Sequence, residues 1–184
     1  MREPVEIPYR PDEKAMEPVR ATKGAAGWDL YTAEDVVLYP FRAIIVPTGI
    51  KAALPVGSTL LILPRSGYSI KNQIVMPNSV GVIDEDYRGG IGISMMWVPE
   101  PTSLLRFEPS WEDPSKITFT WDQTATFRIP KFTRIAQAVL VPYLEQDWRK
   151  VDALPETARG TGGFGHTGVG THDARAFGDA NKIS

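Results

Sequence analysis

Prolines and glycines interrupt the apolar runs of this 184-residue chain so often that no long helix fits between them, since 16 residues are proline and 16 are glycine. Proline lacks a backbone N–H and has a fixed φ, so it stands at strand ends rather than inside regular elements. The runs in between are short and rich in β-branched side chains, as is typical of strands. We therefore predict an all-β fold, a jelly-roll-like distorted barrel. The expected strands are Val36–Tyr39, Ala43–Val46, Ile50–Leu54, Thr59–Leu63, Val80–Ile83, Ile91–Val98, Lys116–Trp121, Thr126–Ile129 and Ile135–Tyr143, with one helical turn at Ser66–Ile70.

Charge and composition exclude several kinds of function. The 20 Lys and Arg against 22 Asp and Glu give a formal net charge of −2, which offers no overall positive field to a polymeric nucleic acid. The chain has no cysteine and 2 histidines, which excludes disulfides, thiolate metal sites and cysteine nucleophiles. No signal-peptide pattern and no apolar stretch of about 18 residues is present. We expect an intracellular, cytoplasmic protein that does not bind membranes.

Two segments depart from the strand pattern. The segment of about 97–130 is rich in proline and tryptophan and is either an inserted hairpin or a long excursion. It either packs its tryptophans on the barrel or binds a partner protein, because exposed tryptophan is typical of interface anchors. The tail is rich in glycine, as flexible termini are. We expect a core of residues 1–155 and a C-terminal arm of residues 156–184.

Polar residues follow two of the predicted strands. Asp84, Glu85 and Asp86 form an acidic turn, which is either a solvated hairpin tip or a place for a general base or the outer shell of a metal. Arg65, Ser66 and the next glycine place a cation, a hydroxyl and a bare amide together, as a simple turn or as a grip for phosphate. Each of these segments alone has a structural explanation.

Three further segments have similar double interpretations. Asp29 lies among small residues, as a packed bend with a satisfied carboxylate would place it. Arg134 and Gln137 lie in a run that opens a strand, where alternation would send their side chains to opposite faces. The glycine-rich segment RGTGGFGHTG formally matches a dinucleotide fingerprint, but the strand and the helix that the fingerprint requires are not readable here. Its bare amides, with Arg159, Phe164 and Thr167, suit a phosphate chain and a stacked base.

In this order the five segments resemble the signature motifs of the trimeric deoxyuridine triphosphatase (dUTPase) family. The motifs stand here as ATKGAAGWDL (21–30), PRSGYS (64–69), NSVGVIDEDYRG (78–89), RIAQ (134–137) and RGTGGFGHTG (159–168). The resemblance implies jelly-roll protomers in a homotrimer with C-terminal arm exchange. Motifs one, two and four of a site would come from one protomer, motif three from a neighbour, and motif five from the arm of the last chain.

The resemblance also implies the reaction, which is hydrolysis of dUTP to dUMP and pyrophosphate by water attacking the α-phosphorus. Asp84 would be the general base, a role that typically supplies about 10² to 10⁴-fold. Asp29 would accept hydrogen bonds from water on a Mg²⁺ ion that the triphosphate chelates, because magnesium tends to retain its waters. The implied cofactor is therefore Mg²⁺, with Asp29 as an outer-shell residue.

The remaining nucleotide contacts are implied in the same way. Gln137 would orient the attacking water, and Arg134 would brace the site, for instance by binding an acidic residue of another chain. Tyr87 would lie against the deoxyribose and exclude a 2′-hydroxyl. The phosphates would be held by Arg65, Ser66 and Gly67, the uracil by Asn78, Val82, Ile83 and Asp84, and the arm would close over the nucleotide with Arg159, Phe164, Gly165, His166 and Thr167.

One departure from the family pattern stands before the fourth motif, where Lys131-Phe132-Thr133 replaces the usual Gly-Asp. Some bacteriophage members carry an extra segment near 97–130, which makes a phage or prophage origin a hypothesis. Two other functions stay open. A dCTP deaminase shares the fold but needs a different second motif and a catalytic glutamate, and a nucleotide-switched regulatory protein would bind its partner through residues 97–130.

Overall fold

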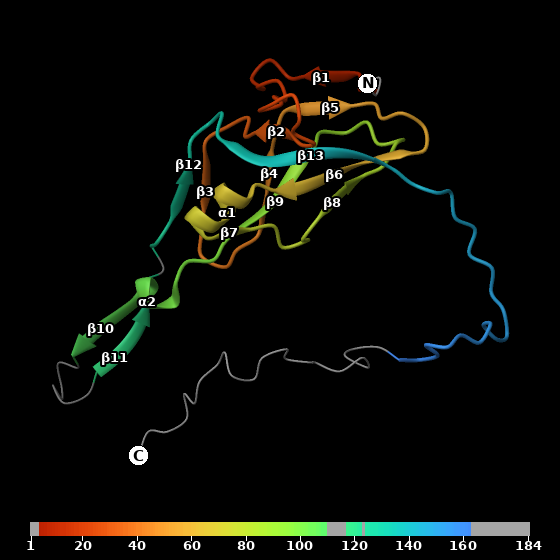
Figure 1. The fold of residues 1–184 in the computed structure, drawn as a ribbon. Coiled ribbons are helices and arrows are strands. Elements are labelled where there is room, and N and C mark those ends of the chain that lie inside the picture. The colour runs from red at the N-terminus through yellow and green to blue at the C-terminus, as the bar shows by residue number, and fades with distance from the viewer. Residues whose placement is uncertain (1–3, 110–116, 123, 163–184) are drawn as a thin grey trace. The chain divides into compact units, whose positions relative to one another are not determined.

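The computed structural model describes residues 4–109, 117–122 and 124–162 (Figure 1). The chain divides into two compact units, Met1–Glu145 and Gln146–Ser184. The boundary expected after residue 155 stays a prediction. None of the helices in the described ranges is long and apolar enough to cross a membrane.

Short strands dominate the described residues, which confirms the predicted all-β fold. The two helices are brief, α1 (Ser66–Asn72) and α2 (Pro101–Leu104). The strands are β1 (Tyr9–Pro11), β2 (Trp28–Tyr31), β3 (Val36–Leu38), β4 (Ile44–Pro47), β5 (Ile50–Ala52), β6 (Ser58–Pro64), β7 (Ile74–Val75), β8 (Gly81–Ile83), β9 (Gly92–Trp97), β10 (Leu105–Pro109), β11 (Ile117–Trp121), β12 (Phe127–Ile129) and β13 (Arg134–Pro142).

The sheet that carries the candidate site has four antiparallel strands in the order β2-β13-β6-β8. β13 is central and long, and Figure 1 shows it running beside β6. It pairs with β2 on one side, where Gln137 lies opposite Asp29, and with β6 on the other, where Ala136 lies opposite Pro64. This order brings the first, second and fourth motifs to neighbouring strands.

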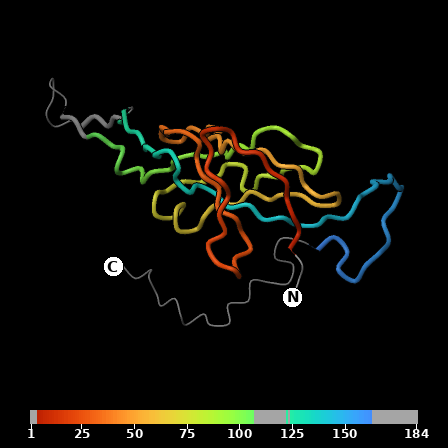
Figure 2. Tube along the Cα trace, turned by 90° about the horizontal axis from the view of Figure 1, so that it is seen from above, coloured from red at the N-terminus to blue at the C-terminus, as the bar shows by residue number. Residues whose placement is uncertain are grey.

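The other strands complete a jelly-roll-type fold around one core. β4, β9 and β7 form a three-stranded sheet, while β12 pairs with β3 and β1 pairs with β5. The pairing of β1 with β5 ties the start of the chain to the core (Figure 2). Alternate positions of β6 and β9 face inward, as strands with one solvated face require. The buried side chains include Leu38, Val46, Ile62, Ile93, Met95, Ile129 and Ile135.

The segment of about 97–130 contains a β-hairpin, so of the two expected forms it is the inserted hairpin and not the long excursion. β10 and β11 pair antiparallel along their whole lengths. At the base of the hairpin the N–H of Asp122 donates to the carbonyl of Leu104 over 2.8 Å, and the carboxylate of Asp122 pairs with Arg106. The carboxylate also accepts hydrogen bonds from the N–H and the hydroxyl of Thr124, which lower the pKa of Asp122. Asp122 therefore holds the two arms of the hairpin together.

The unusual segment before the fourth motif forms a tight turn. The N–H of Thr133 donates to the carbonyl of Pro130 over 3.2 Å, and Phe132 has a φ of 66°. That left-handed conformation is costly for a side chain other than glycine, by roughly 1–2 kcal/mol. The N–H of Lys131 donates to the carboxylate of Asp35 over 2.8 Å, which anchors the turn from outside. The turn therefore delivers Arg134 to the sheet without the family's usual glycine.

Four strands were not predicted from the sequence, and all are short or irregular in pattern: β1, β2, β7 and β10. β2 matters most, because Asp29 lies in a strand rather than in the expected bend. Its four residues mix aromatic, acidic and aliphatic side chains, so they carry no clear alternation. Its extended form follows from pairing with β13.

Candidate functional site

Asp29, Arg65 and Arg134 form a charged cluster, the arginine–aspartate cluster. Asp29 Oδ1 accepts a hydrogen bond from Arg65 Nε over 2.8 Å, and Asp29 Oδ2 accepts one from an Arg134 Nη over 3.3 Å. A second guanidinium nitrogen of Arg65 donates to the carbonyl of Arg134 over 3.1 Å. The carboxylate is nearly buried, with 8% of the residue exposed. Two guanidiniums thus compensate one buried charge and leave a net positive charge at the surface.

Arg134 and Gln137 reach the same side of the sheet, although simple alternation would separate them. The register of β13 against β2 shifts between Arg134 and Ala136, which is a bulge. Gln137 lies opposite Asp29 across the strands, and Arg134 pairs with that same aspartate. The expected acidic partner of Arg134 in another chain has a counterpart here within the chain, namely Asp29.

The side chain of Gln137 is held in one orientation. Its Nε2 donates to the carbonyl of Pro64 over 3.0 Å. On its other side lies Gly27, where an added Cβ would come within 2.5 Å of Gln137 Oε1. The glycine of the first motif therefore leaves room for the amide of the fourth motif. Sequence reasoning did not single out Gly27, because nothing local shows that another segment approaches it.

Ser66 and Gly67 begin α1 directly after Arg65, and both are exposed. The first N–H groups of a helix have no acceptor within the helix. A Cβ at Gly67 would meet nothing within 4 Å, so its backbone lies open. The next residue, Tyr68, packs against the core, and burial raises the pKa of its phenol. Core packing at Tyr68 thus fixes the start of a helix whose outer face presents a hydroxyl and a bare amide.

The acidic turn follows β8 and is closed by hydrogen bonds. The hydroxyl of Thr59 donates to the carbonyl of Ile83 over 2.7 Å, and the N–H of Tyr87 donates to the carbonyl of Asp84 over 3.1 Å. Asp84 itself is exposed. The carboxylate is thus carried by a backbone that is held on both sides of it.

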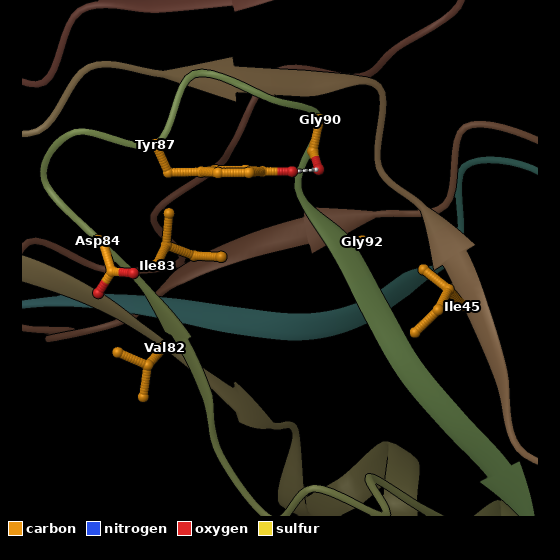
Figure 3. A pocket seen from close by; sticks show the side chains of 7 residues that line it. All are labelled: Ile45, Val82, Ile83, Asp84, Tyr87, Gly90 and Gly92. Atoms are coloured by element: carbon orange, nitrogen blue, oxygen red, sulfur yellow. Dashed lines mark hydrogen bonds between the residues drawn. The ribbon is translucent and has the colours of Figure 1, made fainter.

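A cavity of about 300 Å³ lies beside this turn (Figure 3). In Figure 3 the ring of Tyr87 lies across the space above Ile83, and its hydroxyl donates to the carbonyl of Gly90 over 3.1 Å. A Cβ at Gly89 would collide with the Tyr87 side chain, so this glycine permits the ring its place. The cavity is lined by Ile45, Val82, Ile83, Asp84, Tyr87, Gly90 and Gly92.

Asn78 lies apart from this lining. Its side-chain nitrogen donates to the carbonyl of Val80 over 3.4 Å, at the start of the strand that ends in Ile83. Three lining residues were not among the predicted site residues: Gly90, just after the third motif, and Ile45 and Gly92. The last two are the more distant ones. They come from β4 and β9, and no motif marks them in the sequence.

Within one chain the cavity and the arginine–aspartate cluster lie far apart. Ile83 pairs with Leu60 near the start of β6, whereas Arg65 follows the last residue of that strand. Five positions of extended chain separate these points, about 17 Å at about 3.3 Å per residue. Asp84 and Arg65 of one chain therefore do not contact the same phosphate group or water molecule.

The second unit carries the start of the fifth motif. The N–H of Gly160 donates to the carbonyl of Thr157 over 3.0 Å, and Arg159 Nε donates to the carbonyl of Gly162 over 2.9 Å. The guanidinium of Arg159 thus folds back on its own turn. Phe164, Gly165, His166 and Thr167 lie outside the described residues.

For a metal ion, the described ranges contain no group of three or more His, Cys, Asp or Glu side chains placed to hold one. Asp29 still fits an outer-shell role, because each of its oxygens accepts one hydrogen bond here and retains a second lone pair. The fit therefore concerns water on a magnesium ion rather than direct ligation by the protein.

Comparison with known proteins places these features in a family. A family model described as dUTPase matches residues 13–100 and 109–168. The chain is 41% identical over 155 residues to the deoxyuridine 5'-triphosphate nucleotidohydrolase of Chlamydia pneumoniae, covering 83% of this chain and 90% of that protein. It is 36% identical over 166 residues to the enzyme of the same name from Dinoroseobacter shibae, covering 86% and 92%. The chain belongs to the dUTPase family.

Solved dUTPase structures have the same fold. The dUTPase of Staphylococcus bacteriophage 80alpha with dUPNHPP superposes with a TM-score of 0.73 at 30% identity, covering 89% of this chain and 99% of that one. A mutant dUTPase from phage phi11 of S. aureus, described for the coordination of a structural Mg(II) ion, superposes with a TM-score of 0.65 at 29% identity, covering 81% and 98%. This dUTPase is thus an enzyme, a dUTP diphosphatase.

Proposed function

We propose that this dUTPase hydrolyses dUTP to dUMP and pyrophosphate in sites that are each assembled from three copies of the chain. The observation that carries the proposal is the separation within one chain. A general base has to lie within hydrogen-bond reach of the water it activates. In one protomer the strand position paired with Ile83, next to Asp84, lies five residues before Arg65, about 17 Å along β6. A neighbouring chain that brings its Asp84 to this cluster removes the gap, and closed cyclic assemblies are the usual form of homo-oligomers.

Asp84 is the proposed general base. Its carboxylate is exposed, lines the cavity and stands on a turn closed at its own carbonyl. Deprotonated carboxylates at the rim of a nucleotide pocket suit abstraction of a proton from water. Gln137, held by Pro64, would orient that water or the α-phosphate.

Arg65, Ser66 and Gly67 would bind the phosphate chain. Guanidinium groups bind phosphate oxygens through paired N–H donors, so the outward nitrogens of Arg65 suit a polyanion. Asp29 and the carbonyl of Arg134 orient Arg65 through its Nε and one Nη, which leaves the remaining N–H groups of the guanidinium for phosphate. Arg134 shares the same carboxylate and braces the arrangement.

Mg²⁺ bound to the triphosphate would neutralise charge on the leaving pyrophosphate. Asp29 would hold that ion through water, and Arg65 and Arg134 keep the carboxylate in place for it. The two arginines also pair with Asp29 in a nearly buried place, where an unpaired carboxylate would be costly.

The cavity beside the acidic turn would bind the deoxyuridine part. Backbone groups of Val82, Ile83 and Asp84 would pair with uracil, together with Asn78, and backbone donors cannot easily rearrange to suit cytosine. The ring of Tyr87, fixed by Gly90, would lie against the deoxyribose and leave no room for a 2′-hydroxyl. The arm residues Arg159, Phe164, Gly165, His166 and Thr167 would close over the bound nucleotide, as catalytic lids do.

Two single variants test the shared site when they are mixed. Asp84→Asn and Arg65→Ala chains should each release pyrophosphate from dUTP orders of magnitude more slowly than the parent enzyme. After the two variants are unfolded together and refolded, about a quarter of the sites should combine an intact Asp84 from one chain with an intact Arg65 from another. Activity should then rise to about a quarter of the parent value. Unchanged activity after mixing would overturn the shared site, and a monomer in light scattering would do the same.

Substrate identity is tested by comparing dUTP, dCTP, dTTP and UTP in the same pyrophosphate-release assay. We expect turnover of dUTP alone. Release of ammonia from dCTP would instead identify a dCTP deaminase.

A partner-binding role for the segment 97–130 is the second proposal. The family model passes over residues 101–108, which hold α2 and most of β10. A dUTPase from phage phi11 is described for its species-specific insert, and the phage 80alpha enzyme for a G protein-like control of virulence-gene transfer. Deleting residues 100–126 should preserve turnover and remove a bound partner in pull-down experiments. Identical partners before and after the deletion would defeat this role.

A further inference from the structure

The three neighbouring carboxylates of the acidic turn have different surroundings. Asp84 and Asp86 are exposed, whereas Glu85 between them is half-buried. A charged residue at a turn tip normally remains in water, because burial without a partner is costly. Groups elsewhere in the chain therefore have to compensate the partial burial of the Glu85 carboxylate.

The partners of Glu85 come from two distant parts of the chain. Glu85 Oε2 accepts a hydrogen bond from the N–H of Gly57, in the turn before β6. The carbonyl of Gly57 accepts the N–H of Tyr143 over 3.0 Å, just after β13 ends. The phenol of Tyr143 lies beside the Glu85 carboxylate, and this neighbour raises the pKa of Tyr143. Gly57 thus links Glu85, through its N–H, to the residue after β13, through its carbonyl, and we call Glu85, Gly57 and Tyr143 the Glu85 anchor.

The anchor fixes the backbone next to Asp84. Ile83, on one side of Asp84, is held through its carbonyl by the hydroxyl of Thr59. Glu85, on the other side, is held by the anchor. Without Glu85 the turn keeps its attachment at Ile83, through Thr59 and the pairing of β8 with β6, and loses its hydrogen bond to Gly57 on the other side of Asp84.

The local backbone suits this acceptor. Gly57 has a φ of 75°, a conformation that L side chains rarely adopt, and no atom lies near the position of a Cβ. The hydroxyl of Ser58 donates to the carbonyl of Pro55 over 2.6 Å and holds the turn. The N–H of Gly57 therefore points to Glu85 from a turn that is itself restrained.

We propose that Glu85 is a positioning residue for catalysis, which holds the turn so that Asp84 meets the attacking water. This inference rests on the proposed role of Asp84 as general base. Glu85 itself is not suited to be the base, since its carboxylate accepts the N–H of Gly57, whereas Asp84 lines the cavity. A misplacement of about 1 Å at a catalytic group costs about 10²-fold in rate, which sets the scale of the expected effect.

Four variants of the full-length enzyme test the anchor by steady-state pyrophosphate release and by binding of a non-hydrolysable dUTP analogue. Glu85→Ala should lower kcat about 10 to 100-fold while KM and the Kd of the analogue change less than about 3-fold. Glu85→Gln should recover much of kcat, because its amide oxygen can still accept the N–H of Gly57. Tyr143→Phe should show a smaller loss, and Glu85→Ala combined with Tyr143→Phe should lose less than the two losses multiplied.

Asp86→Asn is the matched control, because it removes a neighbouring carboxylate that makes no hydrogen bond or ion pair with another described residue. It should keep kcat near the parent value. Equal losses in Glu85→Ala and Asp86→Asn would show that charge, not position, matters and would overturn the proposal. A parent-like kcat in Glu85→Ala, or no recovery in Glu85→Gln, would overturn it as well.

Failure of the anchor and failure of the proposed base give different results. If Asp84→Asn keeps full turnover, Asp84 is not the base and the inference falls with it. If Asp84→Asn is inactive while Glu85→Ala is fully active, only the anchor is refuted. Should Glu85→Ala fail to fold as shown by circular dichroism, the split between kcat and KM in Glu85→Gln and Tyr143→Phe still decides.

Discussion

Gly27 is the residue at which the structure predicts a sharp effect from one methyl group. In Gly27→Ala the new Cβ would lie 2.5 Å from Gln137 Oε1, and 3.2 Å and 3.3 Å from two carbons of the same side chain. Restoring an ordinary contact of about 3.4 Å moves the amide by about 0.9 Å. The bond from Gln137 Nε2 to the carbonyl of Pro64 is 3.0 Å long, so a movement of that size distorts it.

The size of the effect follows from these distances. Overpacking against Gln137 together with a distorted hydrogen bond lowers the free energy of unfolding by about 1–3 kcal/mol. If the amide of Gln137 orients the water as proposed, its displacement by about 1 Å lowers kcat by about 10²-fold. The first value is measured by denaturant unfolding and the second by pyrophosphate release from dUTP.

Gly24→Ala is the control, because it lies in the same loop and its Cβ would meet nothing within 4 Å. It should change the free energy of unfolding by less than about 0.5 kcal/mol and leave kcat intact. Adding Gln137→Ala to Gly27→Ala should restore part of the lost stability, because the colliding side chain is then gone. A parent-like kcat in Gly27→Ala, or equal losses in both alanine variants, would refute the reasoning.

The other predictions concern pH and the core. Hydrogen bonds from Thr124 lower the pKa of Asp122. The Asp122 carboxylate therefore stabilises the base of the hairpin above its ordinary pKa of about 3.8, and this stabilisation is lost as pH falls through the lower folded value. Amide hydrogen exchange at β10 and β11 should show this pH dependence, and Asp122→Asn should abolish it. The neighbouring Glu85 carboxylate raises the pKa of Tyr143, so the contribution of the protonated phenol to stability is complete below about pH 10 and is lost as pH rises through the folded value. Tyr143→Phe should reduce the dependence of the free energy of unfolding on pH in that alkaline range. An unchanged dependence would contradict the interaction between Tyr143 and Glu85. Ile62→Ala, at a position 1% exposed, should lower the free energy of unfolding by about 2–5 kcal/mol in a denaturant titration, and a loss below about 1 kcal/mol would contradict the core assignment.

Much of the fold was readable from local patterns. Short β-branched runs between prolines and glycines predicted β6, β9 and β13, because alternation with one buried face is a property of each strand alone. The motifs predicted which residue types carry the chemistry. β2 escaped, because four residues around an aspartate have no periodicity of their own and become extended only against β13.

The site itself was only partly readable. Arg65 and Asp29 are separated by 36 positions, and Arg134 and Asp29 by 105. Alternation along β13 predicted that Arg134 and Gln137 lie on opposite faces of the sheet, which is wrong. The bulge after Arg134 depends on how β13 pairs with β2, and the sequence of β13 alone does not show it. Gly27 and Glu85 showed nothing locally of the partners that give them their importance.

Residue order alone thus determined where the backbone is extended, where it turns and which chemical groups are available, because these depend on side chains within a few positions of one another. The tertiary structure decided which groups meet. It joined Asp29 to two arginines, placed Gln137 between Gly27 and Pro64, and separated Asp84 from Arg65 within one chain. Strand order and register set these distances, and both arise from the packing of all the buried faces together rather than from any one segment.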